Sequence, residues 1–231
     1  MKNILLIGGS YGIGLAIAKE LQNDNNIFIA SRSNEGLEAL NITHIPFDST
    51  TDIIDVSQLP ATIDGLVYCP GSINLRPFRG LKLETFESDM QINFFGMVKV
   101  IQTVLPQLTA SNQSSIVLFS SVAASMGMPF HTSVAAAKGA IEGFAKALAA
   151  EYAPKIRVNV IAPSLTNTPL ADKFLNNETK QEKSSKRHPL KRFGQPEDLA
   201  KMATFLLSDN ASWISGQIMH VDGGMSTLLV N

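Results

Sequence analysis

Short runs of apolar residues alternate along the chain with longer segments in which apolar residues recur every three or four positions. A short apolar run between turn-forming residues is typical of a strand buried on both faces, and the longer spacing is typical of a helix packed on one side. Seven runs predict strands over residues 4–7, 27–30, 44–47, 65–68, 115–119, 157–161 and 217–221. Four segments predict helices over residues 14–22, 86–108, 134–152 and 197–207.

This alternation predicts an α/β fold, in which helices cover both faces of a doubly wound parallel sheet of about seven strands. A chain of 231 residues fits a single domain of this kind, residues 1–231. Ligands of such sheets bind beyond the carboxyl ends of the strands. The residues that follow each strand are therefore the first candidates for a functional site.

Charge and cysteine content argue against several classes of function. Nineteen Lys and Arg residues balance 20 Asp and Glu residues, so no overall field favours a nucleic-acid partner. The single cysteine, Cys69, cannot form an internal disulfide, and no Cys and His cluster has the spacing of a metal site. No apolar stretch approaches the roughly 18 residues of a membrane span, and the first run is too short for a signal peptide. We expect a cytoplasmic protein without metal, membrane or nucleic-acid partners.

A polar segment over residues 176–192 carries six cations against two acids. This composition predicts a mobile loop, and we place a mobile substrate segment near residues 170–192. Two interpretations stay open. The segment is either a solvated insertion whose charge maintains solubility, or a lid that attracts an acidic substrate.

A glycine-rich segment follows the first predicted strand and precedes the first predicted helix, with Gly8, Gly12 and Gly14 in GxxxGxG spacing. Glycine permits tight turns and a close approach of the backbone to a ligand, and the first turn of a helix offers free N–H groups to an anion. The segment therefore predicts a cradle for a pyrophosphate. An ordinary glycine turn between strand and helix is the alternative.

Further motifs follow in order along the chain: Asp48, Tyr68-Cys69-Pro70-Gly71, Asn93, Pro163-Ser164, Thr168 and the tail over residues 214–224. Together they resemble the short-chain dehydrogenase/reductase family over essentially the whole chain. The resemblance implies a Rossmann-type three-layer sandwich, a nicotinamide dinucleotide cofactor and hydride transfer between that cofactor and a carbonyl or alcohol. It implies cofactor contacts by Gly8, Ser10, Tyr11, Gly12, Ile13, Gly14, Ser31, Arg32, Asp48, Cys69, Pro70, Gly71, Lys138, Pro163 and Thr168.

The end of the second predicted strand indicates which dinucleotide binds. Ser31 and Arg32 stand there without an acid. A carboxylate would hydrogen-bond a free ribose 2′-hydroxyl and repel a 2′-phosphate, whereas a planar guanidinium suits the phosphate. We therefore predict NADP (NADPH) rather than NAD. Glu35, beyond the strand end, is the alternative partner for a ribose hydroxyl.

The resemblance also implies the catalytic residues. It assigns polarisation of the substrate carbonyl to Ser121, a water relay to Asn93, and binding of the nicotinamide ribose to Lys138. The family's tyrosine position, four residues before Lys138, holds Val134, which cannot exchange a proton. General acid–base catalysis contributes about 10²- to 10⁴-fold, so positioning and polarisation still permit slow turnover. His131 and Lys138 itself are the candidate replacement donors; alternatively, His131 only lies at the pocket rim.

Two functions from different classes remain open. The first is an NADP-dependent oxidoreductase acting on a carbonyl or alcohol, with an altered proton path. The second is a catalytically impaired NADP-binding protein that serves as a sensor or a partner subunit.

The expected substrate is a small carbonyl or alcohol compound held by residues 125–132, 165–174 and the polar segment 176–192, and it is acidic if that segment is a lid. The resemblance implies a homodimer or homotetramer assembled through helices 86–108 and 134–152. An apolar substrate pocket is expected from Met126, Met128, Phe130, Leu170 and Phe174.

Overall fold

The computed structural model describes residues 1–230 and contains one seven-stranded sheet. Its order is β3-β2-β1-β4-β5-β6-β7, and all neighbouring strands are parallel. This confirms the doubly wound α/β fold, with each strand within two residues of its predicted bounds. The strands are β1 (Asn3–Ile7), β2 (Asn26–Ser31), β3 (Ile42–Pro46), β4 (Gly65–Tyr68), β5 (Ser114–Phe119), β6 (Ile156–Pro163) and β7 (Ile218–Val221).

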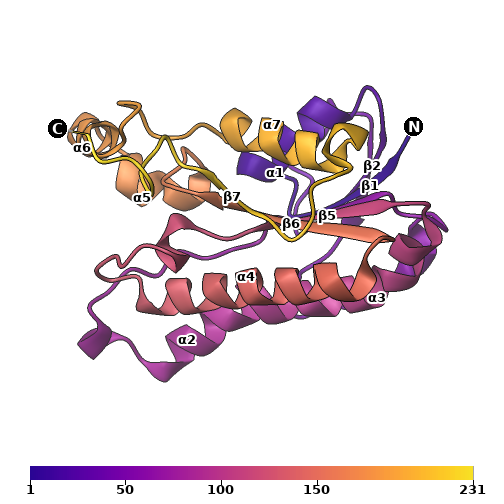
Figure 1. The fold of residues 1–231 in the computed structure, drawn as a ribbon, viewed down its shortest axis with the longest axis horizontal. Helices are drawn as coiled ribbons and strands as arrows, with labels where there is room; N and C mark the ends of the chain where they lie inside the picture. The colour runs from indigo at the N-terminus through magenta and orange to yellow at the C-terminus, as the bar shows by residue number, and fades with distance from the viewer. Residues whose placement is uncertain (231) are drawn as a thin grey trace.

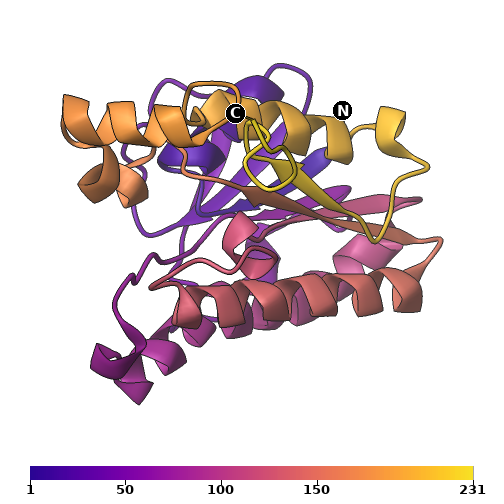
Figure 2. The same ribbon diagram turned by 60° about the vertical axis from the view of Figure 1, so that its left-hand side comes forward.

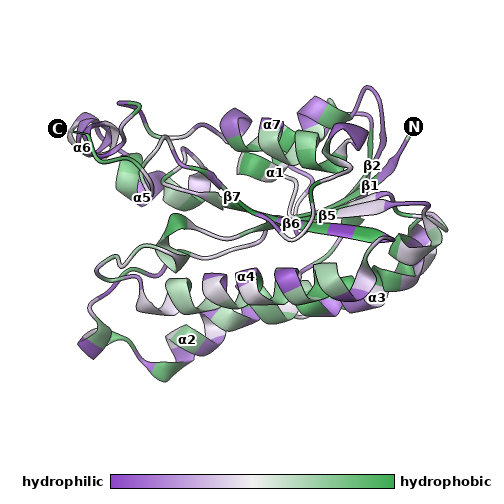
Figure 3. Cartoon of the chain, viewed as in Figure 1, coloured by the Kyte–Doolittle hydropathy of each residue, from purple (hydrophilic) through white to green (hydrophobic). Residues whose placement is uncertain are grey.

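Helices cover both faces of the sheet (Figures 1 and 2). Within β1, Leu5 and Ile7 join one core, and Ile4 and Leu6 join the other, so a uniformly apolar strand supplies both layers. Figure 3 shows hydrophobic residues recurring along the helices and through β6. No described helix is long and apolar enough to cross a membrane. One face holds α1 (Gly12–Leu21) and α7 (Pro196–Leu207), and the other holds α2 (Leu83–Met90), α3 (Gly96–Ala110) and α4 (Thr132–Tyr152).

The helix predicted over residues 86–108 is interrupted. A π-helical turn, Gln91–Phe95, separates α2 from α3. The hydroxyl of Tyr68 at the end of β4 donates to the carbonyl oxygen of Ile92 in this turn, at 2.8 Å. An apolar repeat does not reveal one extra residue in a helical turn, so the sequence could not predict it. The turn carries Asn93, which is fully buried.

The loop predicted over residues 176–192 is largely helical. Helix α6 (Glu178–Arg187) follows the short α5 (Asp172–Leu175), and both lie beyond the carboxyl edge of the sheet in Figure 1. The expectation of a loop was wrong because α6 lacks large apolar residues and therefore shows no helical repeat. The side chain of Asn177 caps its first turn by accepting from the N–H of Lys180, at 3.0 Å. The mobility of this segment stays a prediction.

A crevice is expected where the chain leaves the sheet in opposite directions. From β1 it passes through α1 to β2 on one side, whereas β4 lies on the other side of β1. The segments that follow β1 and β4 therefore diverge at the carboxyl edge. The glycine-rich segment and residues 69–71 both lie at this switch point.

Candidate active site

A first cavity of about 400 Å³ opens at this switch point. It is lined by segments that follow β1, β2, β3 and β4 and by residues after β6. Five residues with predicted cofactor or catalytic roles do not line it: Asn93, Ser121, His131, Lys138 and Pro163. The predicted cofactor residues that line it are Gly8, Ser10, Tyr11, Gly12, Ile13, Gly14, Ser31, Arg32, Asp48, Cys69, Pro70, Gly71 and Thr168.

The glycine turn brings the start of α1 to the cavity. Gly8 has a φ of +79°, and a Cβ placed on Gly14 would lie 2.2 Å from the carbonyl oxygen of Gly8. No larger residue fits at position 14 without moving the turn. The first turn of α1 contains no acid, and Tyr11 before it makes no side-chain cap hydrogen bond. Free N–H groups and the positive end of the helix dipole therefore remain available to an anion such as a pyrophosphate.

Charged residues lie at the far end of the first cavity. Arg32 is exposed just after β2, and Glu35 also lines the wall. The carboxylate of Asp48 accepts hydrogen bonds from the N–H and hydroxyl of Thr50, at 2.9 and 2.6 Å. These hydrogen bonds lower the pKa of Asp48, and Arg32 adds to the effect. The Ser31 hydroxyl donates to the carbonyl oxygen of Ser33, at 2.8 Å, and so holds the turn after β2.

Lys138 lies directly behind the wall of the first cavity. It is buried on α4, and its Nζ donates to the carbonyl oxygen of Phe119 at 2.9 Å. A Cβ placed on Gly71 would lie 3.5 Å from this Nζ and 3.2 Å from Oδ1 of Asn93. Burial lowers the pKa of Lys138 to about 8. An ammonium and a carboxamide therefore meet beneath the Gly71 backbone.

Asn93 belongs to a buried polar cluster that the sequence did not indicate. Its Nδ2 donates to the hydroxyl of Ser72 and to the carbonyl oxygen of Asp89, both at 2.8 Å. Asp89 is fully buried, and its Oδ1 accepts from Ser72 and Asn74. Asp89 Oδ2 and Asn93 Oδ1 have no hydrogen-bond partner among the described residues. An acid in a polar stretch of a predicted helix is usually solvent-facing, so no signal in the sequence predicted this burial.

A second cavity of about 370 Å³ lies between the ends of β5 and β6, the start of α4 and the α5–α6 segment. Ser121, His131 and Val134 line it. Ser121 begins a short 3-10 turn, and its hydroxyl accepts from the N–H of Ala123 at 3.2 Å. The side chain of His131 contacts the carbonyl oxygen of Pro129 through Nδ1, at 2.7 Å. The three side chains are therefore brought together at one surface.

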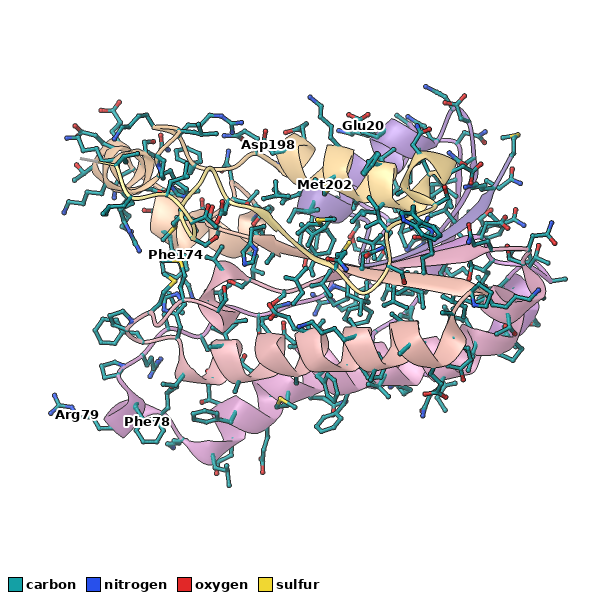
Figure 4. The ribbon with its side chains drawn as sticks, viewed as in Figure 1. Glu20, Phe78, Arg79, Phe174, Asp198 and Met202 are labelled. Carbon is teal, nitrogen blue, oxygen red and sulfur yellow. The ribbon has the colours of Figure 1, made fainter. Side chains whose placement is uncertain are left out.

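The predicted apolar substrate residues divide between the two cavities and the outer surface. Met128 and Phe174 line the second cavity, and Figure 4 shows Phe174 on α5 facing the layer that contains α4. Leu170 lines the first cavity instead. Met126 and Phe130 line neither cavity, and Phe130 is 54% exposed. The prediction was wrong for these two because composition does not show on which side of a loop a side chain lies.

Basic side chains line one side of the second cavity, and no Asp or Glu belongs to its lining. This arrangement makes the cavity positive and favours an anionic ligand. Sequence analysis identified the cations of α6 but could not show which of them border the cavity. The cations at its wall are Lys173, Lys180, Lys183 and Arg187, each of which is also exposed to solvent.

Two further residues of the second cavity were not predicted as site residues. Ser164 follows β6, and its Oγ lies 2.8 Å from Nε2 of His188, which follows α6. His188 is only 2% exposed. Because 24 residues separate the pair, only the folded chain shows that they are neighbours.

Comparisons with known proteins agree with this geometry. A family model described as Enoyl-(Acyl carrier protein) reductase matches residues 8–226. The 3-oxoacyl-[acyl-carrier-protein] reductase FabG of Chlamydia trachomatis is 34% identical over 243 residues, covering 97% of each chain. The ligand-free aldohexose dehydrogenase of Thermoplasma acidophilum has a TM-score of 0.91 and 28% identity, covering 100% of this chain and 96% of the other. A gluconate 5-dehydrogenase of Burkholderia cenocepacia J2315, solved with NADP and tartrate, has a TM-score of 0.89 and 26% identity, covering 99% and 96%.

Proposed function

Because the chain belongs to the short-chain dehydrogenase/reductase family, we propose that it is an NADP-dependent oxidoreductase with an altered proton path. The reaction is hydride transfer between the nicotinamide and a carbonyl or alcohol substrate. One observation carries the proposal: the segment after β4 borders both cavities, with Gly71 in the first and Ile73 in the second. A dinucleotide in the first cavity would therefore end next to the substrate cavity.

The residues of the first cavity fit a phosphorylated dinucleotide. The glycine turn and the start of α1 would hold the pyrophosphate, and Arg32 would bind the 2′-phosphate. Lys138 would hydrogen-bond the nicotinamide ribose, as the family resemblance implies. The NADP in the gluconate 5-dehydrogenase supports the choice of coenzyme. NAD is the weaker alternative, with Glu35 as its ribose partner.

The second cavity would hold the reacting carbonyl. When bound, the reduced nicotinamide supplies a hydride to the carbonyl carbon. Ser121 then donates a hydrogen bond to the carbonyl oxygen, on which negative charge develops. We place Val134 at the family's tyrosine position because Lys138 follows it by four residues. Val134 has no proton to give, so another group must protonate the oxygen, and His131 in the same cavity is one candidate.

The same valine favours a second function. A chain that binds NADP tightly but lacks the proton donor would serve as a coenzyme sensor or as a non-catalytic subunit. Both functions require the dinucleotide to bind. They differ in turnover alone, so binding and turnover must be measured separately.

Calorimetry with NADPH and NADH, followed by NADPH oxidation with a panel of carbonyl compounds, tests the proposal. We expect NADPH to bind more tightly and turnover to disappear in Lys138→Ala. Failure of both coenzymes to bind would contradict both functions. Tight NADPH binding without any turnover would favour the sensor.

Val134→Tyr provides the second arm of this experiment. The valine side chain is 5% exposed at the wall of the second cavity, so a phenol there would enter the space beside Ser121. We expect turnover to rise by about 10²- to 10⁴-fold if the rest of the site is arranged for hydride transfer. If Val134→Tyr shows no turnover either, the result would instead support a protein that binds NADP without catalysis.

We further propose that the substrate is a small carbonyl or alcohol compound with an acidic group. The four cations and the absence of acids in the lining of the second cavity support this class. We propose a homodimer or homotetramer as the functional assembly.

A further inference from the structure

A serine and a buried histidine form a hydrogen-bonded pair in the second cavity. Ser164 Oγ and His188 Nε2 lie 2.8 Å apart, and both residues line the cavity together with Ser121 and Val134. Ser164 is half-buried, and His188 is 2% exposed. The pair therefore contacts the space assigned to the substrate, and the ring itself is shielded from bulk water.

The partners of the ring fix the role of each nitrogen. His188 Nδ1 lies 2.7 Å from the carbonyl oxygen of Ser184, which can only accept, so Nδ1 carries a hydrogen in every state of the ring. Nε2 is thus the atom that gains or loses a proton, and it faces Ser164. A histidine held in this way is suited to proton exchange through its second nitrogen.

The Ser164 hydroxyl is hydrogen-bonded in both states of the ring. When the ring is neutral, the hydroxyl donates to Nε2. When the ring is protonated, Nε2–H donates to Oγ, and the hydroxyl proton is directed to the carbonyl oxygen of Asp222, 3.2 Å away, or to a substrate oxygen. A proton can therefore pass through the pair without rearrangement of the side chains.

We propose that Ser164 and His188 form the proton relay that serves the substrate oxygen in place of a phenol at position 134. This inference rests on the oxidoreductase function proposed above. In reduction, the carbonyl oxygen takes the hydroxyl proton of Ser164 as the carbonyl carbon gains the hydride, and the Ser164 oxygen takes the Nε2 proton of the imidazolium. The products are an alcohol and a neutral ring, which regains a proton from solvent through Ser164 after the alcohol leaves. Oxidation follows the same path in reverse.

In this relay Ser164 is the catalytic residue, because it contacts the substrate oxygen, and His188 acts through it. The charged and titratable groups around the ring come from several elements, so variants must be compared with the wild type under identical conditions. Those groups are Lys180, Lys183, Arg187 and Lys191 on or next to α6, Lys173 on α5, His131 before α4, and Asp222 after β7.

The experiment measures the pH dependence of kcat for carbonyl reduction in wild type, Ser164→Ala and His188→Asn. We expect the wild-type rate to fall as rising pH removes the proton from the imidazolium. Each variant should lose about 100-fold in kcat and this pH dependence. Ser164→Thr, which keeps a hydroxyl, should recover most of the rate. His131→Asn tests the competing donor in the same cavity, and the relay predicts that the pH dependence persists in it. His220→Asn, at an exposed histidine outside the lining of both cavities, is the control and should retain the wild-type rate and profile.

A structural role for the pair, as a tie between β6 and the end of α6, predicts a different result. If the pair has only this structural role, removing either side chain would raise KM or lower the melting temperature but leave the shape of the pH profile of kcat unchanged. An unchanged profile in Ser164→Ala would therefore overturn the relay, and this variant decides the question if His188→Asn does not fold. Loss of the pH dependence of kcat in His131→Asn would identify His131 as the proton donor and would also overturn the relay.

A readout without substrate separates this inference from the proposed function. Nitrogen-15 NMR of the free protein should show His188 with Nδ1 protonated at all pH values, and Ser164→Ala should shift its Nε2 resonance. NADPH binding by calorimetry should be unchanged in both variants, because neither residue lines the first cavity. An Nε2–H tautomer in the neutral ring would overturn the relay. A wild type that binds NADPH but turns over no substrate would mean that the oxidoreductase function itself fails, and the relay with it.

Discussion

Lys138 carries its ammonium group in a buried position, where charge is poorly solvated. Burial lowers its pKa from 10.5 to about 8, against opposing effects of Cys69 and Asp89. Between these two pH values the unfolded chain binds more protons at this residue than the folded chain does. The unfolding free energy contributed by Lys138 is therefore lowest below pH 8 and rises with pH up to about 10.5.

This residue leads to a prediction about pH and stability. The unfolding free energy of the wild type, minus that of Lys138→Met, should increase from pH 8 to pH 10, by an amount on the order of 1 to 3 kcal/mol. Urea denaturation followed by circular dichroism measures it. Lys146→Met, which removes an exposed lysine of the same helix, should give a flat difference. Burial also raises the pKa of Cys69 to about 12, and this lowers the unfolding free energy above pH 9 in the wild type and in the variant alike. Taking the difference between the two proteins largely removes this effect. Parallel curves for wild type and Lys138→Met would contradict a buried ammonium.

Arg32 is the residue on which the proposed preference for NADPH over NADH depends. Charge-assisted hydrogen bonds contribute about 1.5–3 kcal/mol, so Arg32→Ala should raise the Kd for NADPH by about 10- to 100-fold. The Kd for NADH should stay within about 2-fold, because NADH has no 2′-phosphate. Calorimetry measures both values. Arg79→Ala is the control, because Figure 4 shows Arg79 projecting away from the body of the domain. Equal losses for the two coenzymes would show that Arg32 does not read the 2′-phosphate.

At the scale of elements, α6 presents different charges on its different sides. Lys183 and Arg187 line the second cavity, whereas Lys186 pairs with Glu182 on the exposed surface. Exposed pairs of this kind contribute little to stability, but cations in a cavity without acids can bind a ligand. The helix therefore has one side suited to an anionic substrate.

The double variant Lys183→Ala/Arg187→Ala tests this side of α6. It should raise KM for an acidic carbonyl substrate by about 10-fold or more, and leave KM for its neutral ester within about 2-fold. Steady-state kinetics with the two matched substrates measures the effect. Lys186→Ala on the same helix should change neither value. Equal changes for both substrates would indicate a lost wall of the cavity rather than a lost charge.

The elements differ in how far the sequence predicts them. The central strands are short, buried and mostly apolar runs, and the less buried edge strands β3 and β7 still keep apolar residues in short runs, so all seven were predicted. The polar helix α6 was not predicted, because its stability comes from capping by Asn177 and from charges that suit its dipole. The glycine turn between β1 and α1 could be located because residue spacing indicates it. The partners Ser164 and His188 and the burial of Asp89 could not, since they depend on tertiary contacts.

At the scale of the whole molecule, aromatic side chains extend from the core to the surface of the layer formed by α2, α3 and α4. Phe144 of α4 packs edge-on against Phe94, with ring centroids 5.8 Å apart, and Phe94 packs against Phe95 at 5.5 Å. Phe95 is 51% exposed. An apolar group of this kind at the surface is suited to a contact with a second copy of the chain.

Light scattering after gel filtration should give a mass of two or four times 24.9 kDa. Phe95→Glu should lower this mass, because a carboxylate would be buried without a partner in the interface. Phe78→Glu replaces another exposed aromatic residue, outside the helices that we expect to assemble, and should leave the mass unchanged. A wild-type mass of one chain would contradict the proposed assembly.

The two ends of the chain lie at opposite ends of the molecule (Figure 1). Met225, close to the last described residue, forms part of the wall of the second cavity, whereas Met1 is 80% exposed ahead of β1, at the amino edge of the sheet. A purification tag or a biosensor linker joined to the C-terminus would therefore stand beside the substrate entrance and distort kinetic measurements. Fusion or immobilisation through the N-terminus keeps that entrance open.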